Sequence, residues 1–316
     1  MEWEFELIAG PYGGPIYGPV WDGTGLLFSV FSRSLILRYD PETGAISEFR
    51  RYAHGIKGLA FDHHGDLYGC QSSSRRIVRF NRDGSTSPME YRIQGRFHNY
   101  PYDLAVDTRE RIWFSDPVDT LATTGPQLQG PLDHQSILRL ERRGDGRWQI
   151  RRMTHDTSCP RAVVLSLEEK TLYVAENSNE GDATRELRAY PVQEDDRLGP
   201  YAVLHTFGAD RRGPHRGIEG MCLDGAGNIV ACAGWEKSGP GPMIYIFAPS
   251  GRILETHFVP ADQPMQCTFG GDNLSVIYMT TERGELYRVG NTGRQGCMRN
   301  QGANATACNN LEGAQK

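Results

Sequence analysis

A unit of several short apolar stretches recurs six times along this chain, and this repeat constrains the fold more than any other feature. Each copy opens with a polar or aromatic residue, continues as an apolar stretch and then turns sharply before further apolar stretches. The copies begin at Tyr17, Lys57, Tyr102, Arg161, Glu219 and Gln266. Repeats of about 40 to 50 residues that contain several short strands are typical of β-propeller blades. The sequence therefore predicts an all-β, six-bladed β-propeller over residues 1–295.

The turns and strands inside the copies agree with this prediction. Gly-containing turns such as 22–25 and 225–228 fall between the first and second apolar stretches, where tight connections are needed. Third stretches such as Leu35–Tyr39 alternate apolar residues with arginine, as half-buried strands do. No stretch shows a helical period. The Asn-rich segment 296–316 is expected to be a disordered tail outside the fold.

The third and fourth copies are the longest because they carry extra loops at 118–133 and 177–185. Long loops on a rigid scaffold often bind ligands or cover a site. A solvated insertion explains such loops equally well, so the sequence leaves both interpretations open.

Composition excludes several classes of function. The formal net charge is −5 and no basic stripe is present, so we expect no nucleic-acid partner. No apolar run approaches the roughly 18 residues that span a membrane, and the acidic N-terminus lacks the features of a signal peptide. The seven cysteines are scattered and indicate neither a zinc site nor a disulfide framework. We expect a cytoplasmic protein with a small-molecule substrate; the sequence does not determine its oligomeric state.

The first residues of the six copies should ring one end of a polar central channel, because propeller blades are arranged around an axis. An inert packed core would not place polar or aromatic side chains at all six positions. The sequence therefore predicts a functional site at the mouth of the channel. The alternative is a self-satisfied plug, in which Arg161, Glu219 and Lys57 form internal ion pairs beneath the two tyrosines.

Several short sequence segments resemble those of a known protein family. They are Gly18-Pro-Val-Trp-Asp22, Tyr39-Asp-Pro-Glu-Thr-Gly44, Asn99-Tyr-Pro-Tyr-Asp-Leu104, Leu172-Tyr-Val-Ala-Glu176, Gly217-Ile-Glu-Gly-Met-Cys-Leu-Asp224 and Cys267-Thr-Phe-Gly-Gly271. In this order they resemble the SMP-30/gluconolactonase/luciferin-regenerating enzyme family, over roughly residues 5–295. The resemblance implies a six-bladed propeller, and many members are calcium- or zinc-dependent lactonases or related hydrolases. It also implies that a Glu before Gly-Pro, two Asn and an Asp hold the metal in the channel.

This chain departs from the family at those ligand positions. Tyr17 stands where the family has Glu, Tyr102 and Arg161 stand where it has Asn, and Glu219 stands where it has Asp. Calcium takes 6 to 8 oxygen ligands, which one carboxylate beside a guanidinium does not provide. We therefore expect no metal cofactor and interpret Arg161 as a fixed replacement for the metal's charge.

A rearranged calcium or zinc site remains the alternative to metal independence. Such a site would use Glu219 together with Asp103, His98 or His215. Those residues show no recognisable ligand spacing.

The ring residues have complementary chemical capacities. Glu219 is the first choice for a general acid or base. Tyr17 and Tyr102 can donate hydrogen bonds to a developing oxyanion or stack on a ring-shaped substrate, and Arg161 can polarise a carbonyl or bind a carboxylate. Lys57 can orient an anionic group, and we add Gln266 to the substrate-binding set.

Polar residues just before the third and fifth copies are further candidates. His98 and Asn99, and likewise His215, should lie on loops near the channel mouth and contribute to substrate binding. His63 and His64 fall in a turn and are expected to face solvent.

The combined expectation is a metal-independent hydrolase of the lactonase type, acting on a small cyclic or carbonyl-bearing molecule that is anionic or aromatic. Glu219 would act as the acid or base. A metal-free lyase, isomerase or condensing enzyme in the same channel is the first alternative. A non-catalytic propeller that binds a small molecule is the second, because fold analogy alone does not fix a reaction.

Overall fold

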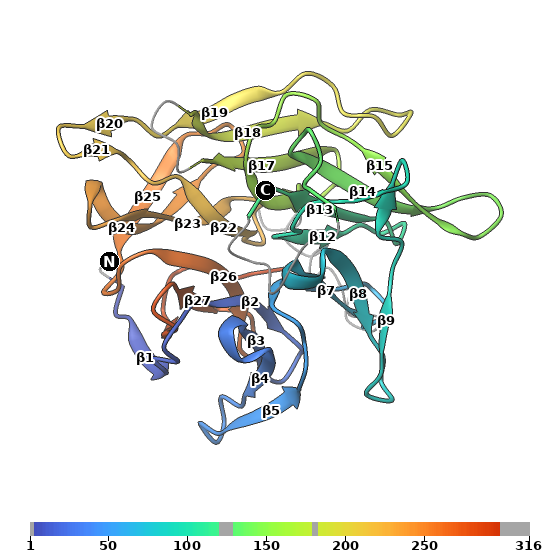
Figure 1. Cartoon of the computed structure of the whole chain (residues 1–316). Helices are drawn as coiled ribbons and strands as arrows, with labels where there is room; N and C mark the ends of the chain where they lie inside the picture. Colours follow the sequence, from blue (N-terminus) through green and yellow to red (C-terminus); the bar gives the residue numbers. More distant parts are fainter. Residues whose placement is uncertain (1–2, 120–128, 179–182, 298–316) are drawn as a thin grey trace, which may run out of the picture.

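Six four-stranded antiparallel sheets surround a central axis in the computed structural model, which describes residues 3–119, 129–178 and 183–297 (Figure 1). The strands of each blade are given from the innermost outward. Blade 1 contains β2 (Ile16–Trp21), β3 (Leu26–Val30), β4 (Leu35–Tyr39) and β5 (Ile46–Arg50). Blade 2 contains β6 (Ile56–Phe61), β7 (Leu67–Gln71), β8 (Arg76–Phe80) and β9 (Thr86–Pro88), and blade 3 contains β12 (Leu104–Val106), β13 (Ile112–Asp116), β14 (Ser136–Arg142) and β15 (Trp148–Arg152). The predicted six-bladed propeller is confirmed.

The remaining blades follow the same order, except that the N-terminal strand completes the last one. Blade 4 contains β16 (Pro160–Leu165), β17 (Thr171–Asn177), β18 (Arg185–Pro191) and β19 (Ala202–Thr206). Blade 5 contains β22 (Ile218–Leu223), β23 (Ile229–Trp235), β24 (Ser238–Phe247) and β25 (Ile253–Phe258). Blade 6 contains β26 (Pro264–Gly270), β27 (Val276–Thr281), β28 (Leu286–Val289) and, as its outermost strand, β1 (Glu6–Ala9). Glu6 lies opposite Arg288 in this last pairing, and their side chains form an ion pair at 2.7 Å. The N-terminal strand and the last three strands of the chain therefore lie in one sheet.

Two short hairpins lie outside the blades: β10 (Arg92–Ile93) with β11 (Arg96–Phe97), and β20 (Ala209–Asp210) with β21 (Gly213–Pro214). The described residues contain two single-turn 3₁₀ helices, η1 (Phe31–Arg33) and η2 (Ser72–Ser74). None of the described residues forms a helix long and apolar enough to span a membrane.

The acidic residue that ends many of the first strands explains the recurrence of this sequence unit. Asp22 accepts hydrogen bonds from the backbone N–H groups of Thr24 and Gly25, at 2.9 and 2.7 Å, and so fixes the turn into β3. Its other oxygen accepts from Arg38 Nε at 2.7 Å, on the third strand of the same blade. The Asp of the first strand and the Arg of the third strand therefore cooperate within a blade.

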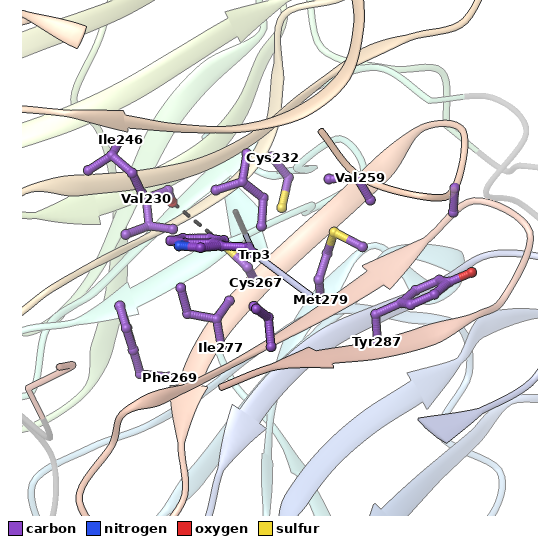
Figure 2. Close-up of a cluster of buried hydrophobic side chains, with 13 residues drawn as sticks. Trp3, Val230, Cys232, Ile246, Val259, Cys267, Phe269, Ile277, Met279 and Tyr287 are labelled. Atoms are coloured by element: carbon purple, nitrogen blue, oxygen red, sulfur yellow. Dashed lines mark hydrogen bonds between the residues drawn. The ribbon is translucent and has the colours of Figure 1, made fainter. Parts of the chain in front are cut away.

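Apolar side chains pack between neighbouring blades. Figure 2 shows the cluster between blades 5 and 6, with Val230 and Cys232 of one blade facing Ile277 and Met279 of the other. Trp3 covers this cluster and stacks on His257 at 3.7 Å. Such inter-blade cores hold the innermost strands in a fixed arrangement around the axis.

Each innermost strand begins at one end of the channel, which we call the ring end, and finishes at the other, which we call the chamber end. Because the strands of a blade are antiparallel, the connections between second and third strands return to the ring end. The predicted insertions 118–133 and 177–185 arise there, but residues 120–128 and 179–182 lie outside the described residues.

The predicted tail lies almost wholly outside the described residues, which end at Cys297. At its start, Gly296 donates its N–H to Leu274 O at 2.8 Å. Among the described residues, five cysteines are free, whereas Cys297 is disulfide-bonded, which the scattered cysteine spacing did not indicate.

Candidate functional site

The first residues of the six repeats gather at the ring end, as the sequence predicted. Tyr17, Lys57, Arg161, Glu219 and Gln266 lie in β2, β6, β16, β22 and β26, and Tyr102 lies two residues before β12. Five of these side chains belong to residues that are at most 6% exposed, and the Arg161 side chain is 12% exposed. We call these six residues the ring.

Two tyrosines and two cations form the centre of the ring. The Tyr17 and Tyr102 rings meet edge to face, with centroids 6.0 Å apart and planes at 81°. Lys57 Nζ lies 4.9 Å from the Tyr102 ring centroid, and Arg161 Cζ lies 4.8 Å from it. These distances are within cation–π range. Burial, followed by the Glu219 charge, raises the pKa of the Tyr102 phenol well above its usual value, so Tyr102 remains a hydrogen-bond donor.

Glu219 is the buried anion of the ring. Tyr102 Oη–H donates to Glu219 Oε2 at 2.6 Å, while Asn177 Nδ2 and Arg216 Nη2 lie 2.7 and 3.0 Å from Oε1. Burial alone would raise the pKa of Glu219, but the charges of Arg216 and Arg161 and the Tyr102 hydrogen bond outweigh it and lower this pKa. Glu219 is therefore ionised at neutral pH.

The hydrogen bonds to Glu219 leave part of its capacity available. A carboxylate offers about four acceptor sites. Among the described residues, Asn177 and Arg216 occupy Oε1, and Tyr102 occupies one site on Oε2. By this count, one acceptor site of Glu219 Oε2, beside the Tyr102 phenol, is not taken by these three donors.

Lys57 and Arg161 share a second carboxylate, that of Asp119. The Lys57 ammonium forms a short ion pair with Asp119 Oδ2, and Arg161 Nη1 lies 3.9 Å from the same oxygen. Burial and the Arg161 charge lower the pKa of Lys57, and the Asp119 charge opposes them. The two cations of the ring are thus arranged to bind one anionic oxygen, which here belongs to Asp119 in the loop that follows β13.

The pairing differs from the plug that the sequence suggested. The nearest cation to Glu219 is Arg216, on the loop before β22, and Lys57 pairs with Asp119. Arg216 and Asp119 lie in connections and Asn177 ends β17, all outside the repeat positions that pointed to the ring. Asn177 and Asp119 do, however, fall at the edges of the two long loops that the sequence left open as either binding loops or solvated insertions.

Glu282 is a second carboxyl group near the ring that the sequence did not indicate. It lies in the turn between β27 and β28 and is half-buried. Burial raises its pKa, and the neighbouring Glu219 charge adds to the rise, against the opposing charge of Arg216. The ring end therefore holds one carboxyl group with a lowered pKa and one with a raised pKa, a difference that often separates a base from an acid.

His98 and Asn99, predicted to bind substrate, lie outside the ring. Both are fully buried. His98 Nδ1 lies 3.0 Å from Asp116 Oδ1, and the Asn99 N–H donates to Asp116 Oδ2 at 2.7 Å. Asn99 Nδ2 also donates to His134 O at 2.8 Å. These bonds give His98 and Asn99 a structural role at the base of a loop, so we remove them from the site.

Gln266 and His215, also predicted to bind substrate, make contacts of other kinds. Gln266 Oε1 accepts the Gly18 N–H at 2.6 Å and so joins blades 6 and 1. His215 Nε2 lies 3.8 Å from Asp210 Oδ2, in the hairpin formed by β20 and β21. Gln266 therefore supports the ring, whereas His215 contacts a hairpin outside the blades.

The ring supplies few of the ligands that the family's metal requires. Glu219 is its one carboxylate, and three donors already occupy that group. The guanidinium of Arg161 and the ammonium of Lys57 are cations that repel a divalent ion. The residues of a rearranged site have other partners: Asp103 accepts the Val163 N–H at 3.0 Å, His98 lies beside Asp116, and His215 lies beside Asp210. These donors do not fit calcium or zinc.

The chamber end contains a cavity of about 230 Å³. It is lined mainly by apolar residues of the innermost strands, including Val20, Leu59 and Val164. Asp103 lines the same cavity, and burial raises its pKa to about 7. The cavity therefore lies at the end of the channel away from the charged ring.

Comparisons with known proteins agree with this architecture. Residues 17–283 match the model of the SMP-30/gluconolactonase/LRE-like region. A pentonolactonase of Haloferax volcanii is 24% identical over 274 residues, covering 85% of this chain and 81% of that protein. A 6-deoxy-6-sulfogluconolactonase of Pseudomonas putida is 29% identical over 97 residues, and that match spans 31% of each protein.

Solved structures show the same fold. A gluconolactonase of Xanthomonas campestris superposes with a TM-score of 0.74 at 22% identity, covering 91% of this chain and 89% of that one. A virginiamycin B lyase of Staphylococcus aureus superposes with a TM-score of 0.56 at 13% identity, covering 92% and 99%. At these identities the likeness shows the propeller fold alone. The family model, in contrast, spans most of the chain, and the protein belongs to the SMP-30/gluconolactonase/LRE-like family.

Proposed function

We propose that this protein hydrolyses the ester bond of a small, anionic lactone at the ring end of the channel, and that it does so without a metal ion. One observation carries the proposal. The ionised carboxylate of Glu219 shares a buried ring with two cations, Lys57 and Arg161, that already bind a carboxylate oxygen of Asp119. The named lactonases among its relatives support the reaction class.

Glu219 would act as the general base. A water bound at the remaining site of Glu219 Oε2 gives its proton to that oxygen while the water oxygen attacks the lactone carbonyl carbon. The Tyr102 hydrogen bond, together with Asn177 and Arg216, fixes the orientation of the carboxylate. This preorganisation limits the reorientation needed during the reaction.

The cations would stabilise the negative charge that develops. As the carbonyl oxygen becomes an oxyanion, Arg161 is placed to stabilise it in the role that a metal has elsewhere. Lys57 would bind the anionic substituent of the substrate in place of Asp119. The bond between the carbonyl carbon and the endocyclic oxygen of the lactone then breaks. The leaving alkoxide takes a proton from Glu282 or from Glu219. The net change is one lactone and one water converted to one hydroxy acid.

A non-catalytic binding propeller is the second candidate, and one observation favours it. The ring residues are almost fully buried and hydrogen-bonded to each other or to neighbours, which also suits a rigid binding surface. A lyase, isomerase or condensing reaction led by Glu219 would use the same residues. Turnover with lactones therefore distinguishes the proposal from both alternatives.

The test is lactone hydrolysis by the wild-type protein and by Glu219→Gln. The substrates are glucono- and pentonolactones and their 6-sulfo and 6-carboxy analogues, and acid release is followed with a pH indicator. We expect the anionic lactones to be hydrolysed fastest and Glu219→Gln to lose roughly 10²- to 10⁴-fold in kcat, the usual contribution of a general base. Binding should change much less, because glutamine keeps the shape of the side chain.

Metal independence is tested separately. We expect EDTA treatment to leave kcat unchanged and elemental analysis to find no calcium or zinc whose binding depends on Glu219. Complete loss of activity with EDTA, restored by calcium, would refute metal independence while leaving lactone hydrolysis in place. A wild-type protein that binds these lactones without hydrolysing them would favour the binding propeller.

A further inference from the structure

Two turns at the chamber end bring together three side chains that commonly bind metals. His63 and His64 lie in the turn between β6 and β7 of blade 2, and Glu110 lies in the turn between β12 and β13 of blade 3. These turns follow the innermost strands, so they lie at the opposite end from the ring. The sequence predicted only that the two histidines face solvent; their proximity to Glu110 depends on the packing of adjacent blades.

The geometry of the three side chains suits a metal ion. One ligand atom from each of His63, His64 and Glu110 lies within 4.8 Å of the other two. His64 Nε2 is 3.0 Å from Glu110 Oε1. Two ligands of a tetrahedral zinc ion lie about 3.3 Å apart when each is about 2.0 Å from the metal. Small side-chain rotations would therefore bring all three atoms to bonding distance.

The local backbone already fixes the two histidines. Asp62 Oδ1 accepts the N–H groups of His64 and Asp66, both at 2.9 Å, which closes the turn. The imidazole rings of His63 and His64 lie 3.8 Å apart between centroids. His63 Nδ1 is buried and has no hydrogen-bond partner among the described residues. An imidazole nitrogen without a partner at this place is a second indication of a ligand, because buried polar atoms are normally satisfied.

We propose that His63, His64 and Glu110 form a binding site for a borderline transition-metal ion such as Zn²⁺, Ni²⁺ or Cu²⁺. Two imidazoles and one carboxylate suit these ions, whereas Ca²⁺ and Mg²⁺ prefer oxygen ligands alone. Three protein ligands leave at least one position for water or another small ligand. The ion would join blades 2 and 3 at the chamber end, independently of the ring.

Isothermal titration calorimetry of the tag-free protein with ZnCl₂ tests the proposal. We expect one Zn²⁺ per chain in the wild type and in Glu219→Gln, and no binding of Ca²⁺ at this site. His64→Ala and Glu110→Gln should each weaken Zn²⁺ binding by at least about tenfold, since even changes around metal ligands have effects of this size. His155→Ala, which removes an exposed histidine elsewhere, is the matched control and should bind as the wild type does.

Two further measurements keep the result interpretable. The thermal midpoint of each variant without metal establishes that it folds, and Zn²⁺ should raise the midpoint of the wild type but not that of His64→Ala, because ligands stabilise the state that binds them. The electron paramagnetic resonance spectrum of bound Cu²⁺ should show two imidazole nitrogens in the wild type and one in His64→Ala. Zn²⁺ binding that is unchanged in both His64→Ala and Glu110→Gln, or absent from the wild type, would overturn the proposal.

Discussion

The two ends of the channel are built by the same six innermost strands, yet they differ in chemistry. At the ring end, Glu219, Lys57 and Arg161 are buried beside one another and bonded to polar partners. At the chamber end, the same strands present mainly aliphatic side chains around a cavity, with Asp103 as the acid among them. The contrast shows that the propeller supplies a symmetric scaffold, while individual positions along each strand decide which end can carry out chemistry.

The comparison also shows why the chamber-end cavity is a poor guide to the proposed active site. The 230 Å³ cavity lies at the chamber end, where apolar walls offer little to stabilise a charged transition state. The ring is more tightly packed but contains fixed charges in a buried environment, where electrostatic interactions are stronger than in water. We therefore propose that the reaction takes place at the ring end, and substitutions at the two ends test this division.

The largest effect should follow from removing the nearest cation of Glu219. Arg216→Leu leaves the Glu219 carboxylate buried without its ion-pair partner, which generally lowers the free energy of unfolding by about 3 to 5 kcal/mol. Lys57 and Arg161 remain nearby, so we expect a value at the low end of this range. Urea unfolding measures the change. Arg197→Leu, which breaks an exposed ion pair with Asp195, is the control and should have little effect. Equal losses of stability in the two variants would contradict the prediction that the buried ion pair of Glu219 contributes more to stability than an exposed ion pair.

The next effect concerns the hydrogen bond from Tyr102 to Glu219. Tyr102→Phe removes a hydrogen bond to a charged group, which is worth about 1.5 to 3 kcal/mol. Because this bond helps to lower the pKa of Glu219, its loss should raise that pKa and move the acidic limb of the activity profile to higher pH. The stability that Glu219 contributes is present above its unfolded-state pKa and is lost as pH falls through its folded-state pKa, so the variant should also lose stability at a higher pH than the wild type. An acidic limb that does not move would remove Glu219 from the rate-determining proton transfer.

The fold was predictable from the sequence because its signal is local and repeated six times. The turn that Asp22 fixes, and the pairing of Asp22 with Arg38, recur in modified form along the chain and mark successive blades. The completion of blade 6 by Glu6–Ala9 was not predicted, because it depends on contacts such as that between Glu6 and Arg288, 282 positions apart. A repeat pattern in the sequence indicates each blade but does not indicate which strand completes the last blade.

The candidate site was predictable only where propeller symmetry applies. Tyr102 and Glu219 occupy equivalent positions at the starts of their blades, so the sequence alone brought them together. Arg216 and Glu282 lie in connections, and Asn177 lies at the C-terminal end of β17, where no repeat specifies the direction of a side chain. His98 illustrates the opposite error: it is a loop histidine near the channel in sequence, but a hydrogen bond to Asp116 holds it inside the protein.

At the chamber end, the charge of Asp103 should decrease stability rather than support activity. Burial raises the pKa of Asp103 to about 7, so the folded state holds a proton that the unfolded state loses near pH 4. Stability from this group is therefore greatest at low pH and falls as pH rises from about 4 to 7. Asp103→Asn should remove this decrease and gain about 1 to 2 kcal/mol at pH 8, less than the full pKa shift would give, because Asp103 is partly exposed. Urea unfolding at pH 5 and pH 8 measures the difference; a variant that is less stable at both values would contradict this account.

The smallest effect should come from the cysteines of the chamber end. Cys222 and Cys267 lie on the innermost strands of blades 5 and 6, with their sulfur atoms 3.8 Å apart, and both line the cavity. Cys222→Ala removes one sulfur atom from a half-buried position next to existing empty space, so we expect a loss of about 1 kcal/mol or less in the free energy of unfolding. Lactone turnover should remain within twofold of the wild type, because the ring residues keep all their contacts. A large loss of turnover in this variant, with stability retained, would mean that the chamber end takes part in the reaction and that the two ends do not function separately.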